Sequence, residues 1–99
     1  MSKYQIQEYG KDKVYLFDTD EALEKWVDRK ENGEFWICQT LYRMKDFWAV
    51  ENTSNYVYGH PNADFRTPKE ATYWLIDRRH KVPPELKKFK DECDLGIGF

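Results

Sequence analysis

The order of apolar and polar residues at the start of the chain indicates two strands. Residues 4–9 alternate between apolar and polar side chains, which is the period of a strand with one buried face. Gly10, Lys11 and Asp12 follow as turn residues, and residues 14–17 then form a short apolar run. This pattern predicts a β-hairpin.

The next segment has the spacing of a helix. Its apolar residues recur three and four positions apart, and they are Ala22, Leu23, Trp26 and Val27. Asp18 or Thr19 can serve as the N-cap, and Gly33 is a residue type that often ends helices. We therefore predict a first helix over residues 19–32.

Three strands are expected after this helix. Residues 35–42 and 47–52 are rich in aromatic and β-branched side chains, and a short connection over residues 43–46 joins them. Residues 56–58 contain two tyrosines and a valine after a polar stretch, and they predict a further short strand.

A second helix has the clearest boundary in the chain. Thr67 is suited to the N-cap, Pro68 stands at the first helical position and Glu70 at the third, which is a capping box. This helix is predicted to run over residues 68–80, because two prolines follow soon after it. Residues 85–93 resume the helical spacing and predict a last helix.

These elements predict an α+β domain. We expect a mostly antiparallel sheet of four or five strands in the order ββαβββαα, with helices packed on at least one face. The 99 residues form a single domain over 1–99. Within it, residues 1–33 and 34–80 are interpreted as two ββα-like units that share one sheet, followed by a C-terminal helix and tail over 84–99.

An internal similarity supports the two units. A shift of 48 positions aligns Phe17 with Phe65 and Trp26 with Trp74. In both segments we expect the phenylalanine to pack against a helix start and the tryptophan to anchor that helix on the sheet.

Composition and charge limit the class of protein. The chain is 40% hydrophobic and 34% charged with a formal net charge of −2, which is typical of a folded domain. Its apolar runs are short, so neither a membrane span nor a secretion signal is expected. Cys38 and Cys93 form neither a disulfide framework nor a metal-binding pair, which predicts free thiols and a cytoplasmic location.

Aromatic residues make up 17% of the chain, and those in the strands define a candidate interface. Alternation places apolar side chains on both faces of residues 35–42 and 47–52. An antiparallel sheet covered on one side usually shows polar residues on the other, so we expect an aromatic face to bind a partner. Few lysines and arginines lie in these strands, which favours a protein, most simply a second copy of this chain. The predicted interface residues are Trp36, Tyr42, Trp48, Tyr56 and Tyr58.

A basic segment over residues 66–90 supports an alternative, nucleic-acid binding. The residues that would contact phosphates are Arg66, Lys69, Arg78, Arg79, Lys81, Lys87 and Lys88. The strands followed by residues 65–71 and Trp74 resemble the three-stranded sheet and helix of the DNA-binding arm domain of tyrosine-type integrases. That resemblance implies a sheet laid into the major groove of DNA, for which the strands here provide Arg43 and Lys45, at a turn.

Catalytic motifs are sparse. His60 lies in a predicted loop and, with Asp64 or Glu51, gives a third hypothesis, a small nuclease in which His60 is the general base. The histidines and cysteines lack the short spacing of zinc ligands, and nucleotide-binding motifs are missing, so no metal or cofactor is expected. We therefore predict a non-enzymatic accessory protein, a homodimer that acts on a macromolecular partner. Small accessory proteins of viruses or mobile elements are often of this size.

Overall fold

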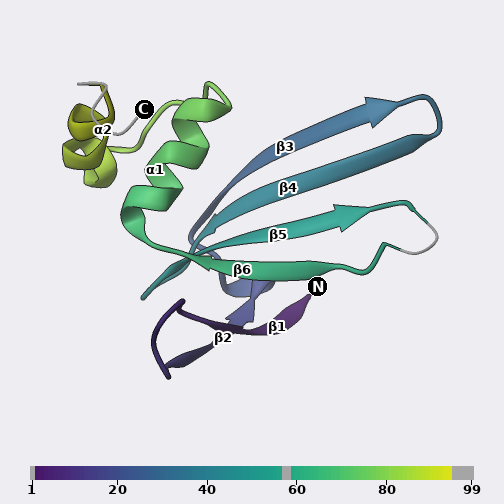
Figure 1. Ribbon diagram of the computed structural model, residues 1–99, viewed down its shortest axis with the longest axis horizontal. Helices are drawn as coiled ribbons and strands as arrows, with labels where there is room; N and C mark the ends of the chain where they lie inside the picture. Colours follow the sequence, from purple (N-terminus) through teal and green to yellow (C-terminus); the bar gives the residue numbers. More distant parts are fainter. Residues whose placement is uncertain (1, 57–58, 95–99) are drawn as a thin grey trace.

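The computed structural model describes residues 2–56 and 59–94, with side chains through Asp91, and it confirms the α+β class (Figure 1). The strands are β1 (Lys3–Gln7), β2 (Val14–Asp18), β3 (Glu24–Asn32), β4 (Phe35–Arg43), β5 (Trp48–Ser54) and β6 (Asn62–Arg66). The helices are α1 (Pro68–Asp77) and α2 (Lys87–Asp94), and the 3-10 turns are η1 (Thr19–Glu21) and η2 (Pro84–Leu86). None of the described helices is long and apolar enough to cross a membrane.

The strands form two antiparallel sheets. Strands β3, β4, β5 and β6 make one sheet in that order, so each strand pairs with its neighbour along the chain. Strands β1 and β2 form the predicted hairpin as a separate two-stranded sheet. The prediction of a mostly antiparallel sheet of four or five strands is therefore confirmed.

Two different layers cover the four-stranded sheet. The helices pack on one face, where the core contains Leu41, Trp48, Val50, Ala71, Trp74, Leu75 and Leu86. The β1–β2 hairpin packs on the other face, where the core contains Ile6, Phe17, Tyr42, Met44 and Ala49. Along β4, alternation sends Leu41 to the helices and Tyr42 to the hairpin. The hairpin therefore explains, within one chain, much of the second apolar face that the sequence assigns to a partner.

The predicted helix over residues 19–32 is wrong. A single 3-10 turn forms at Thr19–Glu21, and Glu24–Asn32 is strand β3, which pairs with β4 along its whole length. Gly33 opens the turn between these strands with a φ of +65°, as the first central position of a type II′ hairpin turn requires. Helix propensity is a weak preference, and nine residues of strand pairing outweigh it.

The similarity between the two halves of the chain does not extend to their helices. Phe17 and Phe65 both lie in the core on the hairpin side, and Thr67 caps α1 with the complete capping box that the sequence predicts. Trp74 is buried on α1, as expected of an anchor. Trp26 instead lies on strand β3, so the prediction of two equivalent helices anchored by tryptophans is wrong.

The sequence pattern does not predict strand β6. In the structure Tyr56 lies outside any strand, residues 57–58 lie outside the described residues, and the last strand is Asn62–Arg66 instead. Its alternation of Ala63 and Phe65 with polar residues is a weak signal, because asparagine and aspartate are uncommon in strands.

Strands β4 to β6 and α1 occur in the order that the resemblance to integrase arm domains implies. The sheet, however, has the helices on one face and the hairpin on the other. The guanidinium of Arg43 is paired with Glu24 and Glu85, at N–O distances of 3.5 and 2.8 Å. The described residues therefore do not present the open basic sheet that such DNA contact requires.

Candidate functional site

The ends of the central strands nearest the β3–β4 turn extend beyond both covering layers (Figure 1). There the side chains of Phe35, Ile37 and Tyr56 are 49%, 47% and 47% exposed. The rings of Phe35 and Tyr56 stack with their centroids 5.1 Å apart. These three residues, called the outer patch below, form an exposed apolar surface of the kind that marks interaction sites.

A row of polar side chains separates the outer patch from the core under α1. Gln39 donates to Asn52 Oδ1, and Asn52 donates to Asn62 Oδ1, both at 2.9 Å. Arg78, the C-cap of α1, donates to Gln39 and also to Asp28 Oδ2, at 2.9 Å from its Nε. The row crosses all four strands and ties the end of α1 to the sheet.

The hairpin side of the sheet contains a buried carboxylate. Glu51 is 8% exposed, and its two oxygens accept hydrogen bonds from the hydroxyls of Tyr4, at 2.7 Å, and Tyr42, at 3.1 Å. Burial first, and the Glu51 carboxylate second, raise the pKa of Tyr4 to about 12 and also raise the pKa of Tyr42. Both phenols are thus neutral donors at physiological pH. Since both oxygens of Glu51 are engaged, a structural role is favoured over the role of orienting group or acid that the nuclease hypothesis gives it.

The predicted interface residues are divided between core and surface. Tyr42 and Trp48 are each only 7% exposed and belong to the core of the single chain, which corrects the prediction that they face a partner. Trp36 is half-buried, and a guanidinium from β3 lies 4.5 Å from its ring. Tyr56 lies in the outer patch, and Tyr58 lies outside the described residues.

The sequence reasoning missed two residues of the outer patch, Phe35 and Ile37. Alternation does place them on one face of β4 together with Leu41. What decides their exposure is the extent of the covering layer, because Leu41 is fully buried whereas Ile37, four residues away, is half exposed. A helix as short as α1, with ten residues or about 15 Å, cannot cover a nine-residue strand from end to end.

Strand β3 forms an edge of the four-stranded sheet. Among the described residues it pairs only with β4, and it is nine residues long. It carries three acidic and three basic side chains, which are Glu24, Lys25, Asp28, Arg29, Lys30 and Glu31. Charges on an edge strand hinder unspecific strand pairing. A strand that pairs with β3 must therefore place opposite charges across from the charged residues of β3.

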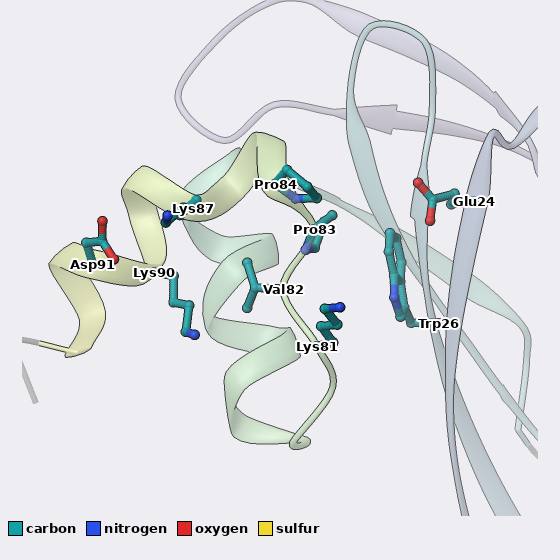
Figure 2. A pocket seen from close by; sticks show the side chains of 9 residues that line it. All are labelled: Glu24, Trp26, Lys81, Val82, Pro83, Pro84, Lys87, Lys90 and Asp91. Atoms are coloured by element: carbon teal, nitrogen blue, oxygen red, sulfur yellow. The ribbon is translucent and has the colours of Figure 1, made fainter.

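A groove of about 610 Å³ lies between the start of β3 and α2 (Figure 2). Its apolar lining consists of Trp26, Val82, Pro83 and Pro84. Figure 2 shows Trp26 projecting from β3 on one side and the α2 side chains on the other, with the loop of the two prolines between them. The Trp26 ring stacks on Trp48 at 5.8 Å, so the core supports this lining.

Two of the predicted phosphate-binding residues line this groove. They are Lys81 and Lys87, and Lys90 joins them. None of the three lysines forms an ion pair with another described residue. Of the acids that line the groove, Glu24 is 3.5 Å from Arg43, and Asp91 is exposed.

The other predicted phosphate-binding residues lie apart from the groove. Three of them are exposed: Lys69 lies on α1, Arg79 follows the end of α1, and Lys88 lies on α2. Arg66 and Arg78 line a second hollow, of about 650 Å³, beside α1. Besides Asp28 and Gln39, Arg78 contacts Asp77 and lies 4.5 Å from the Trp74 ring, and Arg66 donates to a backbone carbonyl. These two arginines are therefore less available to a ligand than the groove lysines.

His60 is exposed in the loop before β6, and its carbonyl accepts a hydrogen bond from Asn62 at 3.4 Å. Among the side chains that the structure describes, in residues 2–56 and 59–91, no group of three His, Cys, Asp or Glu is arranged to hold a metal ion. Comparisons with protein-family models, curated proteins and solved structures found no match.

Proposed function

We propose that this is a non-catalytic binding protein that works as a homodimer and acts on a macromolecular partner. The observation that carries the proposal is the outer patch, where Phe35, Ile37 and Tyr56 are about half exposed beside the edge strand β3. Two copies joined edge to edge along β3 would continue the sheet, with the outer patch of each copy at one end of the shared edge, beside the start of β3 of the other copy.

The charge order of β3 supports a second copy as the partner. In an antiparallel pairing of two β3 strands centred on Asp28, Lys25 of one copy lies opposite Glu31 of the other, and this pair occurs twice. Trp26 lies opposite Lys30, a pairing that a cation–π contact stabilises.

The central position of this pairing brings two Asp28 side chains together. Each of them already pairs with Arg78 at 2.9 Å within its own chain, which offsets their repulsion. Such a two-fold arrangement uses the same surface on both subunits, as most homodimers do.

Light scattering after size exclusion tests the proposal. The wild type is expected to have twice the 12.0 kDa mass of the chain at micromolar concentrations, and Phe35→Ser/Ile37→Ser is expected to be monomeric with an unchanged circular dichroism spectrum. Leu16→Ser is the matched control, because Leu16 is an exposed apolar strand residue on the hairpin, and this variant should remain a dimer.

The register is tested by charge exchange. Lys25→Glu places like charges opposite each other twice and should weaken the dimer, while Lys25→Glu/Glu31→Lys restores both pairs and should recover it. A wild type that stays monomeric at high micromolar concentration refutes the homodimer. A dimer that is indifferent to both sets of changes refutes this interface.

A further inference from the structure

We propose that the groove beside Trp26 is a separate binding site for an acidic peptide segment with an apolar or aromatic anchor residue. This site lies at the start of β3, whereas the outer patch adjoins the far end of that strand, because Asn32 pairs with Phe35. The proposal goes beyond the homodimer. It shares Trp26 with the proposed β3 pairing, in which Trp26 lies opposite Lys30 of the second copy, so peptide binding and mass in solution are both measured on the wild type and on the Phe35→Ser/Ile37→Ser variant.

The apolar lining of the groove fits an anchor side chain. Trp26, Val82, Pro83 and Pro84 provide a rigid surface, since prolines are fixed in φ and the Trp26 ring is stacked on Trp48. A rigid lining loses little conformational entropy when a ligand binds. The volume of about 610 Å³ lies within the range that is typical of small-ligand pockets.

The charges of the groove fit carboxylates. Lys81, Lys87 and Lys90 approach it from the loop and from α2, and none of them forms an ion pair with a described acid. A ligand that carries acidic side chains beside its anchor can satisfy the lysines while the anchor contacts Trp26.

The same charges make a nucleic acid the less suitable ligand. Glu24 and Asp91 also line the groove, and the chain has a net charge of −2. A nucleic acid carries a phosphate at every nucleotide and is repelled by these charges. A peptide can space its carboxylates so that they lie near the lysines and away from the two acids. The experiment must therefore distinguish peptide binding from nucleic-acid binding through Lys81 and Lys87.

Fluorescence anisotropy provides the test. The first probe is a fluorescein-labelled peptide in which one phenylalanine is flanked on both sides by aspartates, within a Gly-Ser background. The second probe has the phenylalanine replaced by alanine, the third has the aspartates replaced by lysines, and the fourth is a labelled thymidine oligonucleotide. We expect the first probe to bind most tightly, and its affinity to fall as salt rises.

The protein variants locate the site. Lys81→Ala/Lys87→Ala/Lys90→Ala is expected to weaken binding of the first probe about tenfold, as the loss of three exposed ion pairs implies. Two matched controls should bind like the wild type. Lys3→Ala/Lys45→Ala removes exposed lysines elsewhere, and Phe35→Ser/Ile37→Ser removes the outer patch.

Each other outcome overturns the assignment. If the first probe does not bind at high micromolar concentration, or binds the triple lysine variant as tightly as the wild type, the groove is not its site. If the oligonucleotide binds more tightly and depends on the same three lysines, the groove is a nucleic-acid site. Loss of binding in Phe35→Ser/Ile37→Ser, while the Lys25→Glu variant with its weakened dimer still binds, would place the peptide on the outer patch. Loss of binding in both variants would show that the peptide needs the dimer, and the groove of a single chain would not be the site.

Discussion

Replacing Tyr42 by phenylalanine is expected to lower the free energy of unfolding by about 2 kcal/mol. The Tyr42 hydroxyl donates to Glu51 at 3.1 Å, and Glu51 is only 8% exposed, so water cannot fully replace the lost donor. A hydrogen bond to a buried charged group contributes about 1.5–3 kcal/mol. The phenylalanine ring keeps the edge contact with Phe17, whose centroid lies 5.2 Å away, so the change isolates the hydroxyl.

Tyr4 is the second donor to Glu51, so Tyr4 and Tyr42 can be compared in a double-mutant cycle. Tyr4→Phe removes the 2.7 Å bond and should cost a similar amount. The double change Tyr4→Phe/Tyr42→Phe should cost more than the sum of the two, because it leaves the carboxylate buried without a donor. Adding Glu51→Leu to the double change should recover part of the loss, since a buried group without a partner is then removed.

Urea unfolding followed by circular dichroism and tryptophan fluorescence measures these free energies, and an unchanged m-value shows that the unfolding reaction is the same. Two results would refute the argument. One is a Tyr42→Phe variant within about 0.5 kcal/mol of the wild type, which is the range of ordinary surface substitutions. The other is a double variant that Glu51→Leu destabilises further.

Three further predictions concern the turn, the cap and the phenol. Gly33→Ala should lower stability by about 1 kcal/mol, because a residue with a Cβ is strained at a φ of +65°, and an unchanged melting temperature would contradict the assigned turn. Thr67→Ala should cost about 1 kcal/mol by removing the acceptor for the Glu70 N–H, whereas Thr67→Ser should cost much less; equal losses in thermal melts would argue against the cap. The pKa of Tyr4 is raised from 10.0 to about 12 in the folded protein, so its contribution to stability is complete below pH about 10 and is lost as the pH rises toward 12. Urea midpoints should therefore fall across that window more steeply in the wild type than in Tyr4→Phe, and parallel curves would refute the assignment.

The elements that the sequence predicts correctly are those with signals close together in the chain. The capping box of Thr67 and Glu70 starts α1 at the expected residue, and the turn after residue 9 joins the two strands of the hairpin. Both signals act over a few residues, so they need no knowledge of the rest of the fold.

The segment over residues 24–32 shows where local signals fail. Its lysines and glutamates favour a helix, and its tryptophan and valine suit a helical face as well as a strand. A glycine at the first central position of a two-residue turn is also a hairpin signal, here Gly33 followed by Glu34, and the interpretation of Gly33 as a helix end overlooks it. Pairing with β4 decides the outcome, and this long-range interaction cannot be read from the segment itself.

The candidate site was predictable only in part for the same reason. The sequence predicts Tyr56 as an interface residue, and it predicts Lys81 and Lys87 as part of a basic segment that contacts phosphates. Arg78, in contrast, spans 50 positions of sequence to reach Asp28, and spacing along the chain gives no sign of that contact. Trp26 joins the groove because β3 begins beside the proline loop, which depends on how the sheet and the helices pack.

The attachment of the β1–β2 hairpin has a consequence for local unfolding. Among the described residues, no backbone hydrogen bond joins Lys3–Asp18 to the four-stranded sheet, so side chains such as Tyr4 and Phe17 hold this layer in place. A layer held in this way is able to detach as a cooperative unit at a lower cost than global unfolding. Amide protons of β1 and β2 are thus expected to exchange with solvent before those of β4 and β5. Each such opening would expose Tyr42 and Ala49, and a state with this apolar surface uncovered is prone to aggregation.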